Sequence, residues 1–359
     1  MEQKLFFPRQ YIQGAGLFKK IPEIMGKYGN IPMALVAYPF YETIQEIMQQ
    51  NEQGITEFFT GECTYAEIER VYKIAKQQKI TVFAGIGGGK ALDCAKVVAD
   101  RLGIPVVIVP TIASTDAPCT GNAVIYNEDG VVAAFIKQKE HPAVVMVDTE
   151  IIAAAPARFL VAGMGDALST GYEANSCVLK GAKTYHGGKL TETGLALARL
   201  ASEIILKYGI QAKEDCIQGL VTTALEKVIE ANILLSGLGF ESCNIAAAHS
   251  IHNGLTLLSQ TKPYQHGEKV AFGVQVGLHL NNANKEELDK VYNFCQAVGL
   301  PITLKEIGLE NVTMEELQLV AADVCKENSF IYNEPVEISP EKVLEAIFAA
   351  DKMGKSWIK

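Results

Sequence analysis

Short apolar runs alternate with helical segments through the first 150 residues of the chain, and beyond that point they cease. Buried-strand patterns cover residues 33–38, 54–60, 80–86 and 104–110. Helical spacing of apolar residues covers residues 63–79, and a glycine turn followed by a helix covers residues 87–103. Strands that are joined through crossover helices pair in parallel. The pattern therefore predicts an α/β domain that is built on a parallel sheet.

The pattern changes near the middle of the chain. Residues 122–136 predict a hairpin with its turn at Glu128-Asp129-Gly130, and residues 142–149 predict a last strand. Past Ala155, β-branched runs become rare, and long segments rich in Ala, Leu, Glu and Lys follow. We therefore expect two domains with a boundary near Pro156, an α/β domain over residues 1–155 and an all-helical domain over residues 156–359.

Composition narrows the classes of partner. The chain has 359 residues, a net charge of −9 and a sequence pI of about 5.3, and no run of Lys and Arg. Nucleic acid and anionic membranes both need a basic surface, so neither is expected as a partner. No apolar run has the length of a signal peptide or of a membrane span. The eight cysteines are scattered without a C-x-x-C motif, which favours reduced thiols and a cytoplasmic location.

A glycine-rich loop follows the strand pattern at residues 80–86. Gly87, Gly88 and Gly89 allow close approach of a ligand, and the helix that begins behind them offers free N–H groups and a positive dipole end. These features are typical of a pyrophosphate-binding loop. Lys90 stands where the third glycine of G-x-G-x-x-G belongs, and the loop does not match the P-loop pattern either. A tight turn between strand and helix, without a ligand, is the alternative.

A hydroxyl-rich segment, "TIASTDAPCTGN", follows the strand pattern at residues 104–110 and contains one acid, Asp116. Ligands of open α/β sheets bind at the carboxyl ends of the strands, where this segment is expected. An ordinary surface loop rich in turn-forming residues is the alternative interpretation.

Three of the six histidines fall in one short window of the predicted helical domain. His249 and His252 are three residues apart, so on a helix they share a face, and His266 follows. Imidazole and carboxylate ligands suit Zn²⁺ or Fe²⁺, and Asp166 is a candidate third ligand. The alternatives are an ordinary helix N-cap for Asp166 and hydrogen-bonded core residues for the histidines.

Taken together, these motifs resemble the metal-dependent (iron-containing) alcohol dehydrogenase superfamily, most closely its glycerol-oxidising members. The resemblance rests on "GIGGGKALDCAK", "PTIASTDAP", "APARFLVAGMGDAL", "GFES" with "AAAHSIHNGLT", and "HGEKVAFG" in that order. It extends from Tyr11 to Leu304. It implies a Rossmann-like parallel-sheet domain followed by an all-helical domain, as in the dehydroquinate-synthase-like fold.

The resemblance also implies roles for particular residues. It implies one divalent metal ion per chain, most often zinc, held by Asp166, His249 and His266, with His252 beside the ligands or on the substrate side. Asp116 is then the acid on the substrate side, and Asp116 and His249 are the expected catalytic residues. The residues expected to contact NAD are Gly87, Gly88, Gly89, Lys90, Thr111, Ser114, Thr120, Asn122 and Tyr126.

The sequence departs from the family pattern at three places. Tyr38 stands where relatives have an acid that binds the adenosine ribose, which leaves both NAD and NADP open as cofactors. Gly171 stands where a bulkier residue is expected, and Cys243 and Asn244 replace glycines. We expect the last two departures to change the shape of the substrate pocket.

The function that the resemblance implies is metal-dependent, NAD-linked oxidation of glycerol, or of a similar vicinal diol, to dihydroxyacetone by hydride transfer. The metal would lower the pKa of the substrate hydroxyl. The alternatives are a dehydrogenase of the same superfamily for another diol, an amino alcohol or a hydroxy acid, possibly with NADP, and a non-catalytic ligand-binding protein. A homo-oligomer, commonly an octamer, is the assembly that the resemblance implies.

Overall fold

The computed structural model describes residues 2–49 and 54–357. Its chain divides into two compact units. The α/β unit comprises residues 7–155 and 218–221, and the helical unit comprises residues 1–6, 156–217 and 222–359. The break at Ala155 and Pro156 coincides with the change of pattern in the sequence. Residues 1–6 group with the helical unit, since Gln3 forms a parallel bridge with Lys189.

The α/β unit is built on a six-stranded parallel sheet in the order β1-β8-β5-β4-β2-β3, with a separate antiparallel hairpin of β6 and β7. The strands are β1 (Tyr11–Gly14), β2 (Pro32–Val36), β3 (Ile55–Phe58), β4 (Val82–Gly87), β5 (Val106–Pro110), β6 (Asn122–Tyr126), β7 (Val132–Lys137) and β8 (Val144–Asp148). The central strands are apolar and buried on both faces, as parallel strands require.

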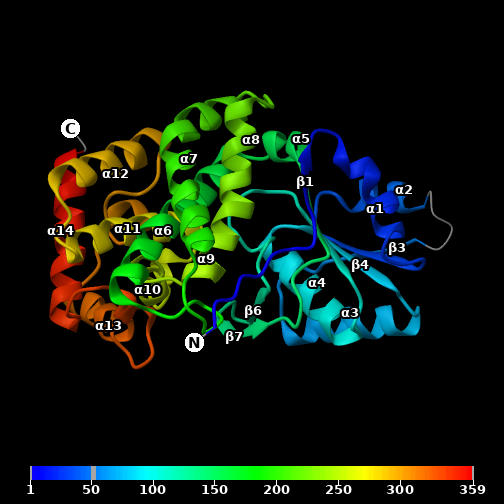
Figure 1. Ribbon diagram of the computed structural model, residues 1–359, viewed down its shortest axis with the longest axis horizontal. Helices are drawn as coiled ribbons and strands as arrows, with labels where there is room; N and C mark the ends of the chain where they lie inside the picture. The colour runs from blue at the N-terminus through cyan, green and yellow to red at the C-terminus, as the bar shows by residue number, and fades with distance from the viewer. Residues whose placement is uncertain (1, 50–53, 358–359) are drawn as a thin grey trace. The chain divides into compact units, whose positions relative to one another are not determined.

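Helices cover both faces of this sheet (Figure 1). They are α1 (Ile21–Gly26), α2 (Tyr41–Met48), α3 (Tyr65–Gln77), α4 (Gly89–Leu102) and α5 (Thr149–Ala154). Apolar side chains of α1 and α2 pack on one face around Val36 and Ile86. On the opposite face α4 approaches so closely that a Cβ on Gly85 would lie 2.5 Å from Cβ of Ala95.

The predicted fold class is confirmed: a parallel-sheet domain precedes a helical remainder. Each strand that the apolar runs predicted is present, and so is the hairpin. The strand β1 was not predicted from the sequence. It is only four residues long, half-buried along its length, and contains Gln13 and Gly14, so it has no continuous apolar run, and only its parallel pairing with β8 marks it as a strand.

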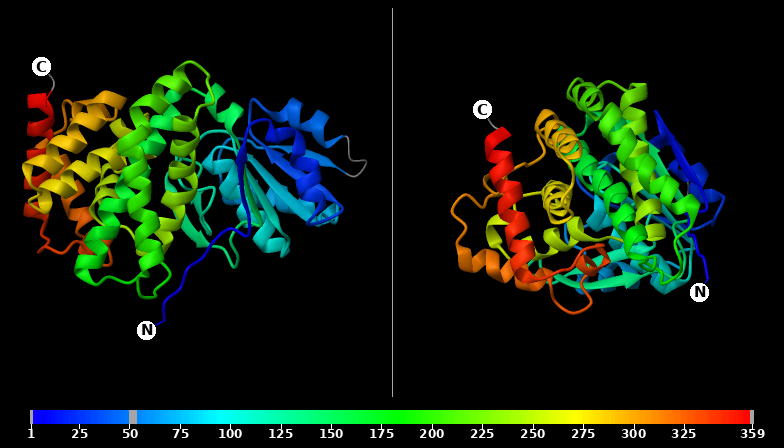
Figure 2. Two further views of the ribbon diagram at one scale, coloured as in Figure 1. Left: turned by 45° about the horizontal axis from the view of Figure 1, so that its top comes forward. Right: turned by 60° about the vertical axis from the view of Figure 1, so that its left-hand side comes forward.

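The helical unit contains nine α-helices and one π-helical turn among its described residues. They are α6 (Ala157–Lys180), α7 (Glu192–Ile217), α8 (Thr223–Glu230), the π-helix η2 (Ala231–Leu235), α9 (Ser236–Cys243), α10 (Ala247–Leu255), α11 (His266–Leu280), α12 (Lys285–Val298), α13 (Met314–Val324) and α14 (Pro340–Trp357). Helices α10, α11, α13 and α14 share one apolar core, and α13 and α14 lie side by side in both views of Figure 2.

Helices α6 and α11 cross at a pair of glycines. A Cβ on Gly165 would lie 2.2 Å from the carbonyl oxygen of Gly267, and a Cβ on Gly267 would lie 1.8 Å from that of Ala162. Arg158, in the first turn of α6, makes two hydrogen bonds to the carboxylate of Glu268, in the first turn of α11, at 2.7 and 2.8 Å. The two backbones therefore touch, and an ion pair fixes their starting ends.

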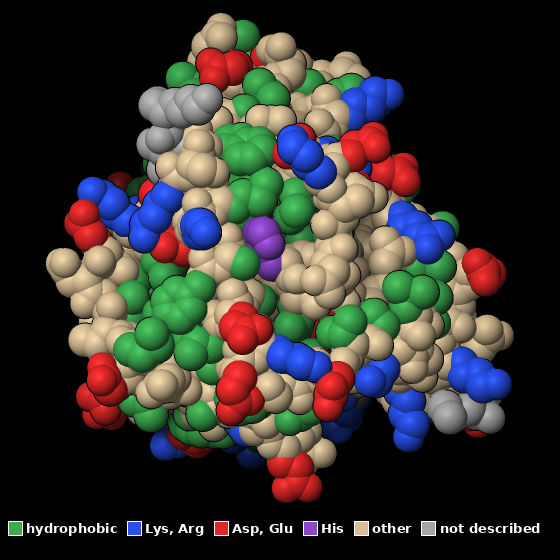
Figure 3. All heavy atoms as spheres, turned by 90° about the vertical axis from the view of Figure 1, so that its left-hand side faces the viewer, with side chains coloured by type: hydrophobic (Ala, Val, Ile, Leu, Met, Phe, Trp, Pro, Cys, Tyr) green, Lys and Arg blue, Asp and Glu red, His purple; other side chains and the backbone are tan. Residues whose placement is uncertain are grey.

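The surface carries charges of both signs. On the face in Figure 3, basic and acidic side chains are scattered among apolar ones, so the described residues there form no extended basic patch of the kind that a phosphate backbone requires. All eight cysteines are free thiols, and seven are buried. Among the described helices, none has the length and the apolar character needed to cross a membrane.

The glycine contact generates a first prediction. The substitution Gly267→Ala will lower the free energy of unfolding by about 1–3 kcal/mol, the usual cost of overpacking a close contact, because backbone atoms of α6 have to move. The urea midpoint, followed by circular dichroism, measures this change. Gly26→Ala is the control, since among the described residues no atom from beyond its own helix and chain neighbours lies within 4 Å of its Cβ position, and alanine favours the helix. Equal midpoints for both variants would contradict the role of the contact.

Candidate active site

Asp166 lies in the middle of helix α6 and is buried. The alternative interpretation of Asp166 as a helix N-cap is therefore wrong, because α6 begins nine residues earlier at Ala157. A buried carboxylate inside a helix needs partners from other elements. Two imidazoles supply them.

His249 of α10 and His266 of α11 both direct Nε2 to the same carboxylate oxygen. The Nε2 atom of His249 lies 3.4 Å from Oδ1 of Asp166, and that of His266 lies 3.1 Å from it. One ligand atom from each of these three residues lies within 4.8 Å of the other two. The structure thus brings together the three residues that the sequence suggested as metal ligands.

The remaining ring nitrogens set the tautomers. Nδ1 of His249 lies 2.7 Å from Oε2 of Glu173, which can only accept, so Nδ1 carries the proton. His252 donates from Nδ1 to Oδ1 of Asn253 at 3.1 Å, which leaves its Nε2 as an acceptor for Nδ1–H of His266 at 3.0 Å. Both candidate ligands can therefore offer an Nε2 lone pair.

Glu173 also organises the start of helix α10. Its Oε1 accepts from the backbone N–H groups of Ala246 and His249 at 2.8 and 3.0 Å, and Glu334 accepts from that of Ala247 at 2.8 Å. Helix α10 has no side-chain cap of its own, so two buried carboxylates from elsewhere satisfy its first N–H groups.

Sequence reasoning missed both of these acids. Glu173 lies seven residues after Asp166, which places the two carboxylates on the same face of α6. That spacing was a usable signal. Glu334 follows a short 3-10 turn far along the chain, and no local pattern connects it to α10.

The acids and imidazoles of this cluster shift one another's pKa values. Burial alone would lower the pKa of His249, but the carboxylates of Glu173 and Asp166 outweigh burial and raise it well above the ordinary value. Burial would likewise raise the pKa of Asp166, but His266 and His249 hold it far below the usual range. Burial, together with the neighbouring His266, lowers the pKa of His252 well below that of a free histidine. A cation that binds here would therefore displace protons, and its affinity would fall as the pH falls.

Two of the three distances between the candidate ligand atoms fit a tetrahedral metal ion. Two ligand atoms that each lie about 2.05 Å from zinc at the tetrahedral angle are about 3.3 Å apart. The distances from Asp166 to the two imidazoles, 3.1 and 3.4 Å, bracket this value. Three protein ligands leave a fourth position for a substrate oxygen. Without a metal, the same atoms can form an ion pair between the carboxylate and protonated imidazoles. Low pH favours this protonated state, and high pH favours metal binding.

The α/β unit contains the glycine loop at the carboxyl end of β4. Gly87 has φ +151°, a conformation that side chains rarely adopt, and a Cβ there would lie 2.7 Å from Cβ of Ala37. Helix α4 begins at Gly89, where a Cβ would lie 3.9 Å from Oγ1 of Thr115 and 3.9 Å from Cβ of Ala117. The loop thus presents the N-terminus of a 14-residue helix, which favours an anion.

The hydroxyl-rich segment lies against this loop. The backbone N–H of Thr111 donates to the carbonyl oxygen of Gly87 at 3.0 Å. Lys90 pairs with Glu62 at 2.5 Å, and its ammonium lies 5.0 Å from the centre of the Tyr126 ring. Of the other expected contacts, Ser114, Thr120 and Asn122 are buried and Asp116 is half-buried. Of the expected cofactor residues, Thr111 thus contacts the glycine loop, and Lys90, one residue into α4, lies over Tyr126 of the hairpin.

Two of the sequence departures lie in helix packing. A Cβ on Gly171 would lie 2.4 Å from Oγ of Ser202, so this glycine permits the contact of α6 with α7. Cys243 is fully buried in an apolar cluster with Ala174 and Leu195. In contrast, Tyr38 follows β2 and is 84% exposed, beside the strand that ends in the glycine loop.

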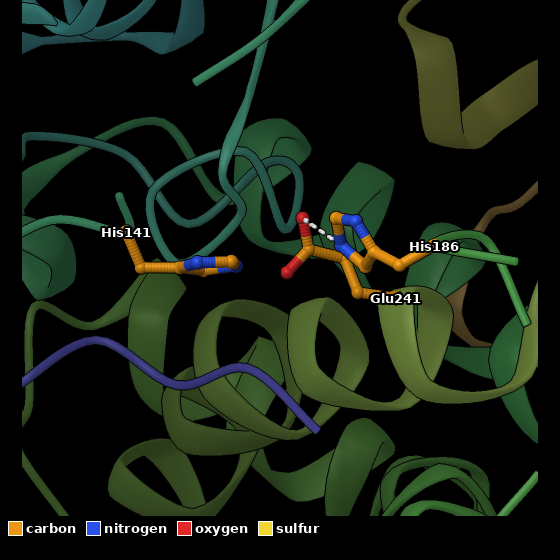
Figure 4. A group of neighbouring side chains, drawn as sticks. All are labelled: His141, His186 and Glu241. Atoms are coloured by element: carbon orange, nitrogen blue, oxygen red, sulfur yellow. Dashed lines mark ion pairs between the residues drawn. The ribbon is translucent and has the colours of Figure 1, made fainter. Parts of the chain in front are cut away.

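The other three histidines make different contacts. His186 and Glu241 point toward each other, with Nε2 3.5 Å from Oε1 (Figure 4). His279 lies 3.2 Å from the hydroxyl of Tyr292. His141 packs against Gly121, where a Cβ would lie 2.8 Å from the imidazole.

Comparison with known proteins gives a consistent result. The model of the family "Iron-containing alcohol dehydrogenase" matches residues 8–149. The chain is 47% identical to a glycerol dehydrogenase of Thermotoga maritima over 97% of both chains, and 39% identical to a glycolaldehyde reductase of Halobacterium salinarum over 97% of both. A solved structure of a probable glycerol dehydrogenase from Sinorhizobium meliloti 1021 is 41% identical, covers 99% of this chain and 100% of its own, and superposes with a TM-score of 0.94.

The site generates a second prediction. Glu173→Gln will weaken zinc binding by about 10- to 100-fold, as the loss of a carboxylate that orients a ligand usually does. Glutamine has one side-chain oxygen. It can accept hydrogen bonds from the backbone N–H groups of α10 or from Nδ1–H of His249, but not from both. Titration against a chromophoric chelator measures the affinity. Glu203→Gln, an exposed position on α7, is the control, and equal affinities for both variants would remove Glu173 from this role.

Proposed function

The chain belongs to the iron-containing alcohol dehydrogenase family, and we propose that it is a metal-dependent, NAD-linked glycerol dehydrogenase. The chain is 47% identical to a glycerol dehydrogenase over nearly its whole length, which supports glycerol as the substrate. The observation that carries the mechanism is the convergence of Asp166, His249 and His266 on one point of the helical unit.

In this proposal Asp166, His249 and His266 hold one divalent ion, and two imidazoles with one carboxylate favour zinc or iron. Such an ion, when bound, polarises the substrate hydroxyl and lowers its pKa. Glu173 and His252 keep the two imidazoles in the tautomer that offers Nε2. Asp166 is buried and lies within 3.4 Å of both imidazoles, so its negative charge lies at the proposed metal site.

The proposed cofactor site is the edge of the α/β unit at the glycine loop. The N-terminus of α4, behind Gly88 and Gly89, would bind the pyrophosphate. The nicotinamide of NAD, when bound, accepts the hydride from the substrate carbon. Acids that end a neighbouring strand bind the ribose hydroxyls of NAD and repel the phosphate of NADP. Tyr38 does neither, so NADP belongs beside NAD in every assay.

Asp116 is proposed to act on the substrate side. Its carboxylate can accept hydrogen bonds from the hydroxyls of a diol that are not oxidised, or receive the proton that leaves the reacting hydroxyl. The proposal includes an assembly of identical chains, for which the family resemblance suggests eight.

A different small substrate is the second candidate. The 39% identity to a glycolaldehyde reductase over nearly the whole chain supports another two- or three-carbon hydroxy compound. Gly171 and Cys243 give no additional support, since both lie in helix contacts.

The third prediction tests the metal and the substrate together. Purified protein will reduce NAD with glycerol at alkaline pH, where the deprotonated substrate hydroxyl is favoured. The activity will disappear after chelation and return with zinc, because the ion supplies the positive charge that stabilises this form. Absorbance of the reduced nicotinamide measures the rate, with NADP in a parallel assay.

The possible failures of this assay are distinct. Turnover that survives complete removal of metal would exclude the metal mechanism. Bound metal without turnover of glycerol would exclude glycerol and favour the second candidate, for which glycolaldehyde with reduced cofactor is the next substrate to assay.

The fourth prediction concerns Asp116. Asp116→Ala will lower kcat/KM for the diol by about 10- to 100-fold, the equivalent of one hydrogen bond to a charged group. Asp129→Ala, at the exposed hairpin turn of the same unit, will leave kcat/KM unchanged. A wild-type value for the Asp116 variant would rule out its role at the substrate.

A further inference from the structure

A buried lysine, Lys96, lies behind the glycine loop of the α/β unit. It is not among the proposed contacts of the cofactor or the substrate. Lys96 is on helix α4, two turns beyond the residues of the loop, and its side chain is only 1% exposed. Long cationic side chains are almost never buried unless they are paired. The partners of this ammonium therefore show what it does.

The ammonium connects α4 to the hydroxyl-rich segment. Nζ of Lys96 donates to the backbone carbonyl oxygens of Ala117 at 2.9 Å and Thr120 at 3.4 Å, and also to that of Asn122. The carboxylate of Asp93, one turn earlier on α4, lies 2.9 Å from Nζ and balances its charge. An ammonium has three N–H donors, and here all three can be directed to one short stretch of backbone.

The carboxylate of Asp93 extends the connection. Its second oxygen accepts from the backbone N–H of Val124, at the start of the hairpin, at 2.9 Å. Side chains one turn apart on α4 thus bind a carbonyl-rich turn on one side and a strand on the other. The segment from residue 117 to residue 124 is held against the helix whose N-terminus forms the glycine loop.

This segment contains or adjoins three of the residues that the proposed function uses. Asp116 directly precedes it, and Thr120 and Asn122 lie within it. We propose that Lys96, neutralised by Asp93, is a positioning residue that holds the substrate- and cofactor-binding segment in register with the pyrophosphate-binding helix. This proposal rests on the proposed function, because it assumes that the segment binds the cofactor and the substrate. It needs no ligand contact by Lys96 itself.

Another structural fact separates this role from general stability. Lys90, on the same helix, pairs with Glu62 at the surface with 43% of its side chain exposed, whereas Lys96 is bonded to main-chain atoms of a single segment. Main-chain partners fix the path of the backbone whatever the side chains are. A backbone that is held before the ligand arrives costs less entropy to order on binding, and small displacements of aligned groups reduce rates strongly.

The test uses full-length protein with two changes made together, Asp93→Asn and Lys96→Met, so that no unpaired charge remains buried. Fluorescence titration with NADH gives Kd, steady-state kinetics give KM for NAD and kcat separately, and hydrogen exchange reports on residues 117–124. We expect Kd and KM to rise by about 10- to 100-fold, as for misplaced binding groups, with faster exchange in that segment. Zinc affinity will stay at the wild-type value, since Asp166, His249 and His266 belong to the other unit.

The control is Lys73→Met, which removes a lysine from an exposed pair with Glu69 on the neighbouring helix α3. Wild-type Kd, KM and exchange in the double variant would overturn the proposal, because a merely structural pair would change stability and leave these values alone. If the double variant does not fold, Asp93→Asn with Lys96→Gln gives the same readouts, since it also leaves no charge buried and its amide can still donate two hydrogen bonds. NADH titration does not depend on glycerol turnover, so failure of the proposed function is recognised separately.

Discussion

The contact between the backbones of α6 and α11 is the constraint on which the proposed metal site depends. Gly165 and Gly267 directly adjoin Asp166 and His266 in the sequence, so the point where the helices touch is also the point where carboxylate and imidazole meet. A side chain at either glycine would separate the two backbones. The ion pair of Arg158 with Glu268 joins the same two helices, from two turns before Gly165 on α6 to the residue after Gly267 on α11.

Around this contact, hydrogen bonds decide the chemistry of the imidazoles. Histidine can present either ring nitrogen, and the choice depends on which nitrogen has a strong acceptor. Glu173 provides that acceptor for His249, and His252 provides it for His266. Because Glu173 also satisfies the start of α10, the orientation of the helix and the tautomer of its histidine are set by the same carboxylate.

In the α/β unit, the charges around the glycine loop bear on its proposed binding of an anion. A pyrophosphate needs free N–H groups and little negative charge nearby, and the glycine loop at the start of α4 supplies the first. The acids close behind it are neutralised: Asp93 by Lys96 and Glu62 by Lys90. The Asp93–Lys96 pair also bonds the hydroxyl-rich segment and the hairpin to α4, so one pair sets both the charge balance and the position of this backbone.

The sequence alone determined the architecture and most of the candidate site. Continuous apolar runs predict the parallel strands, and long segments rich in Ala, Leu, Glu and Lys predict the helical half, because burial leaves a local pattern in the sequence. Short motifs likewise identified the glycine loop and the window of histidines, and the family resemblance then implied the three candidate ligands and the role of Asp116. Only the tertiary structure decided that Asp166 lies inside a helix, and that Glu173, Glu334 and Lys96 support the sites. Their partners are backbone groups and side chains distant in the chain, and no local periodicity records such contacts. The edge strand β1 escaped prediction for the same reason, since its pairing with β8 joins residues more than 130 positions apart.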